Sequence, residues 1–309
     1  MASRPRGSSS RLRRTLLAAL VPASVAAPVS AAARPGAVPA PVPAPLKPVS
    51  AATPAALDAR YAAVRDGVRA AERTAAAHGD RGRAAVLRAM APPGRHFLSF
   101  DGRDGGRTVE VFGDPARAGR IAVLVPGSDT SLDTYGRLRA GAMALRRRVG
   151  GGAAVVARLG YGTPGTLSPE VPTPGRADGA APRLRRFVRE VNAARPGARI
   201  SPLWHSYGSV VCARAAPGLR VADLVLYGSP GVGVDSVGRL HTRATVWGAE
   251  APHIRLHLPF TTVGFGADPV SKGFGARVFD AGSGGHSDYL KPGSAALTNL
   301  ARIVAGRHA

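Results

Sequence analysis

The chain has 309 residues, of which 45% are hydrophobic and only 5% aromatic, which suffices for one large α/β domain with an N-terminal extension. Its formal net charge is +23, and its positive residues are almost all arginines scattered along the chain. Because this scatter lacks the basic, aromatic-lined face of a nucleic-acid site, we expect no nucleic-acid partner and instead an electrostatic association with an anionic cell envelope.

Residues 1–33 have the composition of an export signal. An arginine-rich start is followed by an apolar stretch from Thr15 to Val29 and by small residues at 31–33, the pattern of a signal-peptide cleavage site. Prolines interrupt the apolar stretch, which disfavours a membrane-spanning helix. We therefore expect a protein that is secreted, extracellular or associated with the cell envelope. The pair Arg13-Arg14 leaves both the twin-arginine and the general secretory route open.

The following part of the chain changes from proline-rich to helical. Residues 34–54 are rich in Ala and Pro and predict an extended linker between the cell surface and the folded part. Residues 55–94 are predicted to form an N-terminal helical segment with a break at residues 78–80. The apolar positions that recur at helical spacing are Leu57, Tyr61, Val64, Val68 and Ala71. Residues 95–309 are predicted to form the main domain.

From residue 95 onward, short apolar strands alternate with helices. A hairpin pattern comes first, and helices separate most of the later strands, which favours a mostly parallel sheet covered on both faces. Ligands of such sheets bind beyond the carboxyl ends of the strands, so a site is expected in the loops there. The expected strands are residues 96–100, 108–112, 120–125, 153–159, 199–203, 221–227, 244–248 and 276–280, and the expected helices are residues 132–149, 182–194 and 294–305.

One strand ends in a motif that resembles a nucleophile elbow. The stretch Trp204-His205-Ser206-Tyr207-Gly208 follows a strand and precedes a small-residue helix, and it matches G-x-S-x-G except that Trp204 replaces the first glycine. In this setting a sharp turn exposes the serine hydroxyl above the sheet, so Ser206 is the predicted nucleophile. The alternative is an ordinary turn with an N-cap. His205 is expected to point away from the hydroxyl and to serve packing.

Two other loops supply partners for Ser206. The strand at residues 120–125 leads into a Gly127-Ser128 turn, whose N–H groups together with that of Tyr207 are predicted to form an oxyanion hole. A plain strand-to-helix turn is the alternative for this loop. After the last strand, a glycine-flanked histidine, His286, stands where the general base of a Ser-His-acid triad occurs in the chain order.

Taken together, these motifs resemble an actinobacterial α/β-hydrolase family of unknown function, the DUF1023 group. The resemblance covers about residues 95–306, and it implies an α/β-hydrolase fold and a Ser-His-Asp triad with serine as the nucleophile. It is carried by Val125-Pro126-Gly127, Leu159-Gly160-Tyr161, His205-Ser206-Tyr207-Gly208-Ser209, Gly228-Ser229-Pro230-Gly231-Val232-Gly233, Phe274-Gly275-Ala276 and Gly285-His286-Ser287-Asp288-Tyr289.

The acid of the triad is the point at which this chain departs from the resemblance. Family members carry an aspartate soon after the strand at 244–248, whereas residues 249–254 hold no aspartate here. Three carboxylates remain as candidates. Asp268 lies in the loop before the last strand, Glu250 is closest to the expected place, and Asp235 follows the preceding strand. We favour Asp268.

These features predict a cofactor-free serine hydrolase that cleaves a carboxylic ester through an acyl-enzyme on Ser206, with His286 as general base. The expected substrate is a small-molecule or lipid ester, no metal is expected, and the sequence does not indicate an oligomeric state. The departures at Trp204 and at the acid raise a second hypothesis, a degenerate α/β-hydrolase that binds a ligand or the envelope without turnover. A third is a basic adhesion protein for which the fold is only a scaffold.

Overall fold

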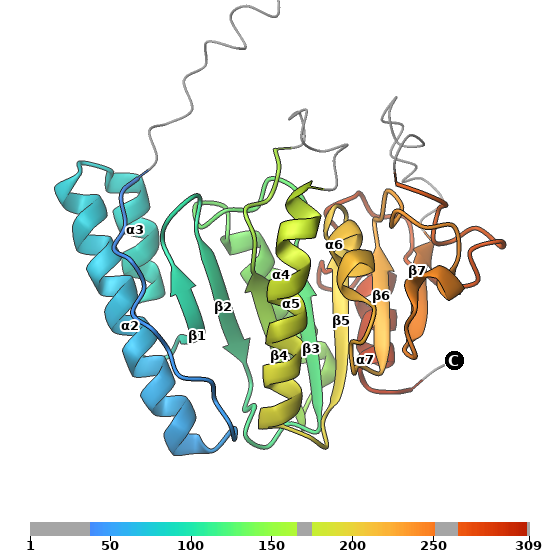
Figure 1. Cartoon of the computed structure of the whole chain (residues 1–309), viewed down its shortest axis with the longest axis horizontal. Helices are drawn as coiled ribbons and strands as arrows, with labels where there is room; N and C mark the ends of the chain where they lie inside the picture. Colours follow the sequence, from blue (N-terminus) through green and yellow to red (C-terminus); the bar gives the residue numbers. More distant parts are fainter. Residues whose placement is uncertain (1–37, 166–174, 251–264, 308–309) are drawn as a thin grey trace, which may run out of the picture. The chain divides into compact units, whose positions relative to one another are not determined.

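The computed structural model describes residues 38–165, 175–250 and 265–307, and within these Pro39–Ala309 forms one compact unit (Figure 1). The predicted export signal at residues 1–33 lies outside the described residues. In the described part, no helix is both long and apolar enough to cross a membrane.

Eight strands form one sheet in the order β1-β2-β4-β3-β5-β6-β7-β8. The pairs β1–β2 and β2–β4 are antiparallel, and every other neighbouring pair is parallel. All the strands expected from the sequence are present, with ends that differ by a few residues. The strands are β1 (His96–Asp101), β2 (Arg107–Phe112), β3 (Arg120–Val125), β4 (Ala153–Leu159), β5 (Arg199–His205), β6 (Asp223–Tyr227), β7 (Thr245–Glu250) and β8 (Arg277–Asp280).

Helices cover the sheet on both faces, as predicted. In Figure 1, α5 and α6 lie in front of the sheet, α4 and α7 lie behind it, and α2 and α3 stand beside β1 at one edge. The helices are α2 (Pro54–Ala77), α3 (Arg81–Met90), α4 (Gly136–Val149), α5 (Gly175–Ala194), α6 (Gly208–Ala215) and α7 (Ala295–Val304), with a short 3-10 helix at Val237–Leu240. The apolar positions predicted for the first of these helices are all buried in α2.

Helix α5 is longer than the sequence indicated. We expected an amphipathic helix that begins at Pro182, but the helix begins at Gly175 and carries Pro182 in its interior. An interior proline removes one helical hydrogen bond. The helix tolerates that loss because it buries an apolar face against the sheet, formed by Ala177, Ala180, Ala181, Leu184 and Val188.

The Ala/Pro-rich segment is extended but is not a free spacer over the residues that are described. Residues 39–52 contain no helix or strand. The N–H of Ala52 donates to the carbonyl of Ala194 at 3.2 Å, and the guanidinium of Arg60 donates to the carbonyl of Lys47. This segment therefore packs on the domain, in contact with α2 and with the end of α5.

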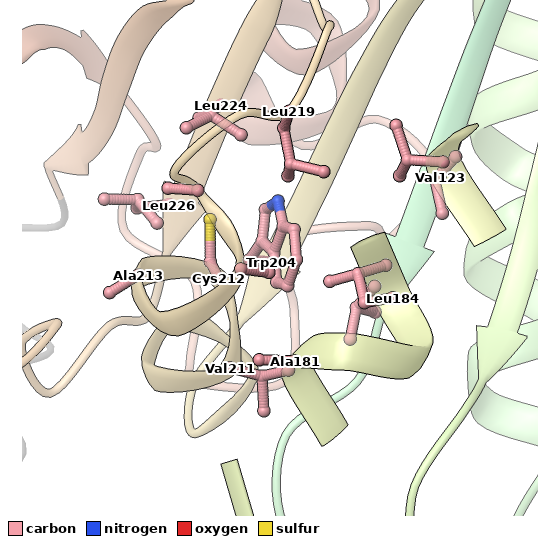
Figure 2. Packing of buried hydrophobic residues seen from close by; sticks show 14 of the residues in the cluster. Val123, Ala181, Leu184, Trp204, Val211, Cys212, Ala213, Leu219, Leu224 and Leu226 are labelled. Atoms are coloured by element: carbon pink, nitrogen blue, oxygen red, sulfur yellow. The ribbon is translucent and has the colours of Figure 1, made fainter. Parts of the chain in front are cut away.

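Small residues fill the core beneath α5 and α6, and one large side chain lies at its centre. The indole of Trp204 is fully buried between Leu184 of α5 and the first turns of α6, with Val211 and Cys212 beside it (Figure 2). Cys212 is free and buried, as predicted. In the sheet, Trp204 pairs with Val125 of β3 and with Leu226 of β6. The carboxyl ends of these three central strands therefore meet at one edge.

Candidate active site

The turn after β5 has the backbone of a nucleophile elbow. Ser206 has φ of +53°, in the left-handed region that costs a non-glycine residue about 1 kcal/mol or more. Its N–H donates to the carbonyl of Tyr227 at 3.1 Å, and its carbonyl accepts from the N–H of Ser209 at 2.9 Å. The end of β6 and the start of α6 thus hold Ser206 in this conformation.

Two glycines permit the close packing around this turn. A Cβ atom on Gly208 would lie 2.9 Å from the carbonyl oxygen of Pro126, so α6 can approach the loop after β3 only with glycine there. A Cβ atom on Gly127 would lie 2.5 Å from the Cβ of Ser206. The loop predicted to supply the oxyanion hole therefore lies in direct contact with Ser206.

Trp204 does not disturb the elbow. Its side chain lies within the core under α5 and α6, among residues that include Ala181 and Ala213, and it does not line the cavity that holds Ser206 (Figure 2). The small side chains of its neighbours leave room for the indole, which fills a volume that a glycine at this position would leave empty.

A cavity of about 190 Å³ opens over Ser206 at the carboxyl edge of the sheet. Ser206 and His286 both line it, although β5 and the loop after β8 are far apart in sequence. No direct hydrogen bond joins these two side chains in the described structure. The remaining lining residues are Pro126, Ser128, Asp129, Thr130, Arg137, Leu138, His205, Tyr227, Ser287, Tyr289 and Leu290.

His205 has a role that the sequence did not indicate. Its Nε2 lies 2.8 Å from the carbonyl oxygen of His286, and the two rings are 4.7 Å apart between centroids. A carbonyl oxygen only accepts, so His205 carries a proton on Nε2 and donates it. Burial lowers the pKa of His205 to about 4, so it is neutral at pH 7. We expected His205 to serve only in packing, whereas its side chain also holds the backbone of His286 through this hydrogen bond.

The partly buried His286 ring packs against Gly228 at the end of β6. A Cβ atom on Gly228 would lie 2.9 Å from its Cε1 and 3.1 Å from its Nδ1, so only glycine leaves room for the imidazole. Burial lowers the pKa of His286. The imidazole is therefore neutral at pH 7, the protonation state that a general base requires.

Among the described residues, no carboxylate pairs with Nδ1 of His286. Its Nδ1 is buried and has no hydrogen-bond partner in the described part of the chain. The side chains of Asp268, Glu250 and Asp235 are all exposed, and Asp268 Oδ1 accepts the N–H of Val270 at 3.0 Å. Residues 251–264, where the resemblance implied an aspartate, lie outside the described residues and contain neither Asp nor Glu.

The loop after β3 is held in place by a tyrosine that we did not single out as a site residue. The hydroxyl of Tyr161 donates to the carbonyl of Pro126 at 2.7 Å, inside the protein. Farther along the loop, the N–H of Asp129 donates to the carbonyl of Pro164 at 3.0 Å. The sequence feature that could have pointed to Tyr161 is its place in the Leu159-Gly160-Tyr161 motif. Within the described residues, no group of three or more His, Cys, Asp or Glu side chains is arranged to hold a metal ion.

Comparison with known proteins identifies the family. Residues 101–259 match the sequence pattern of the family described as alpha/beta hydrolase. The uncharacterized protein Rv2079 of Mycobacterium tuberculosis is 30% identical over 256 residues, which cover 68% of this chain but only 38% of that protein. The uncharacterized protein Rv0963c of the same species is 32% identical over 219 residues, 62% of this chain and 79% of that protein.

Solved structures show weaker similarity. The a/b serine hydrolase XC6422 from Xanthomonas campestris aligns with a TM-score of 0.43 and 18% identity, over 70% of this chain and 94% of that one. Esterase LipW from Mycobacterium marinum aligns with a TM-score of 0.42 and 17% identity, over 77% and 90%. Because these values are low, the assignment rests on the sheet topology and the family match. On those grounds the chain belongs to the α/β-hydrolase family.

Proposed function

We propose that this protein is a serine hydrolase that cleaves a carboxylic ester through an acyl-enzyme on Ser206, with His286 as general base. The observation that carries the proposal is the conformation of Ser206, which is held at positive φ over a cavity that a partly buried, neutral histidine shares. A strained serine backbone at this place is the feature that an ordinary N-cap turn does not require.

In the proposed mechanism, Ser206 Oγ attacks the ester carbonyl carbon while the imidazole of His286 takes the hydroxyl proton. The N–H of Tyr207 and that of Gly127 or Ser128 stabilise the negative charge on the former carbonyl oxygen. The C–O bond to the alcohol then breaks, and His286 returns the proton to the leaving alkoxide. A water molecule, deprotonated by His286, hydrolyses the acyl-enzyme and restores Ser206.

His205 serves this mechanism as a positioning residue. Its hydrogen bond to the His286 carbonyl fixes the loop after β8, and its low pKa keeps a second positive charge away from the base. For the acid we retain Asp268, which lies in the loop before β8. Burial and, to a smaller extent, the charge of Asp268 raise the pKa of Tyr289, which lines the cavity, while a hydrogen bond with the backbone of Gly228 opposes this rise.

The unpartnered Nδ1 of His286 favours a second candidate, a degenerate hydrolase that binds a ligand or the envelope without turnover. Export through residues 1–33, association of the basic protein with an anionic envelope, and membership of the actinobacterial DUF1023 group also remain our proposals. The similarity to mycobacterial proteins supports the last of these.

Labelling with a fluorophosphonate tests the proposed function. We expect the wild-type protein to be labelled, Ser206→Ala to lose labelling, and His286→Ala to label far more slowly. Ser287→Ala, which changes another hydroxyl in the same cavity, is the matched control and should label normally. A folded wild-type protein that takes no label would refute the hydrolase and support the non-catalytic candidate.

A further inference from the structure

A larger cavity lies away from Ser206 and shares no described lining residue with the active-site cavity. It measures about 390 Å³, within the range of ligand sites, and it is an open hollow lined by residues 43–46, by Arg60 of α2, by α5 and by β1, β2 and β4. A smaller cavity of about 130 Å³ adjoins it. The two share the lining residues Arg60, Ser99, Phe187 and Glu190.

A buried arginine with unused hydrogen-bond donors lines the larger cavity. Arg158 lies on β4 opposite Val109 of β2, and only 4% of its surface is exposed. Its Nε and Nη1 are buried and have no hydrogen-bond partner within the described residues. The guanidinium carbon lies 5.3 Å from the centre of the Phe187 ring. A side chain on Gly160 would collide with the guanidinium, so glycine at that position makes the space for it.

The surroundings of Arg158 hold surplus positive charge. Two other arginines in the wall are already paired, Arg107 with Asp101 at 2.7 Å and Arg186 with Glu190 at 3.0 Å. Arg183 has no ion-pair partner in the described part of the chain. Burial lowers the pKa of Arg158 to about 10; Arg183 adds to this effect, whereas Tyr161 and Glu190 oppose it, and the guanidinium remains charged at neutral pH. A buried charge of this kind is unfavourable unless an anion pairs with it.

Apolar side chains continue the site beyond the arginines. Near Arg158 the wall includes Leu46, Phe100, Val109, Leu159 and Phe187. In the adjoining cavity it includes Leu57, Leu98, Val111, Ile121, Val156 and Val191. A ligand that matches both the positively charged Arg158 and these apolar walls has a negatively charged end and an aliphatic chain.

We propose that these two cavities bind a fatty-acid-like carboxylate, whose anionic end pairs with Arg158 and whose chain extends into the adjoining apolar cavity. Guanidinium groups pair well with carboxylates, and the apolar walls would bury the chain. This site is independent of the proposed chemistry at Ser206, because its residues do not line that cavity.

Calorimetric titration of the full-length chain with decanoate tests the proposal, with decanol as a neutral ligand of the same length. We expect saturable binding of decanoate and binding of decanol that is weaker by about tenfold or more. Arg158→Met should weaken decanoate binding by about tenfold or more, since methionine fills the space without the charge. Arg189→Met, which removes an exposed charge from α5 outside the cavity, should change nothing.

Two further variants keep the test decisive. Arg183→Met should weaken decanoate binding to a smaller extent, and it provides the readout if Arg158→Met does not fold. Arg137→Met changes the active-site cavity instead. Loss of decanoate binding with Arg137→Met but not with Arg158→Met would place the ligand at Ser206 and overturn the proposal. Absence of saturable binding to the wild-type protein, or equal binding of decanol, would overturn it as well.

Discussion

Replacing Trp204 by the glycine that elbow motifs usually carry should damage the protein. The Trp204 side chain is fully buried in the core under α5 and α6. Removing a buried tryptophan side chain to alanine costs about 3–5 kcal/mol, and glycine in a strand adds about 0.5–1 kcal/mol. Trp204→Gly should therefore lower the free energy of unfolding by roughly 3.5–6 kcal/mol, a large part of the roughly 5–15 kcal/mol typical of a domain.

Urea unfolding followed by circular dichroism measures this loss, and Trp204→Phe is the matched control. The indole Nε1 is buried without a hydrogen-bond partner in the described structure, so phenylalanine loses some volume but also removes an unsatisfied donor. We expect Trp204→Phe to stay within about 1.5 kcal/mol of wild type. A loss below about 2 kcal/mol for Trp204→Gly would refute the conclusion that this side chain sustains the core.

Three other predictions follow from contacts near the site and in the sheet. Glu110→Gln should destabilise the protein by about 3–5 kcal/mol in urea unfolding, because Glu110 is buried and pairs with Arg95 at 2.7 Å. The rate of Ser206 labelling should be level near pH 7 and should fall as the pH drops through a His286 pKa below 6.5, since burial lowers that pKa and protonation removes the base; a midpoint above 6.5 would contradict this. Tyr161→Phe should cost about 1 kcal/mol of stability and slow labelling several-fold, because the loop after β3 loses its hydrogen bond; unchanged labelling would show that the loop needs no such support.

The sequence predicted the sheet well because its strands carry local patterns. Apolar runs such as residues 120–125 and 153–159 are buried on both faces, and such runs bounded by glycine turns are recognisable without tertiary information. The elbow was predicted for the same reason. Strand, serine, glycine and helix follow one another within residues 199–215, so the sharp turn is encoded locally.

What the sequence did not reveal depends on contacts between distant parts. The hydrogen bond from His205 to His286 joins residues 81 positions apart, and nothing in either local motif indicates it. The packing of residues 39–52 against the domain is of the same kind, since a proline-rich composition reports stiffness and not docking. The start of α5 was misplaced because burial of its apolar face outweighs one lost hydrogen bond at Pro182.

The identity of the triad acid is the last prediction, and the Asp268→Asn variant tests it. Reaching Nδ1 of His286 requires the Asp268 carboxylate to leave the Val270 N–H, a bond worth about 1 kcal/mol. Pairing with the imidazolium that forms during acylation is worth more than this, because charge-assisted hydrogen bonds are stronger. If Asp268 is the acid, Asp268→Asn should lower kcat by about 10⁴-fold, as loss of a triad acid does elsewhere, while Asp235→Asn and Glu250→Gln should leave it unchanged. An Asp268→Asn enzyme within twofold of wild type would exclude Asp268, and unchanged activity in Asp235→Asn and Glu250→Gln as well would exclude all three candidate carboxylates.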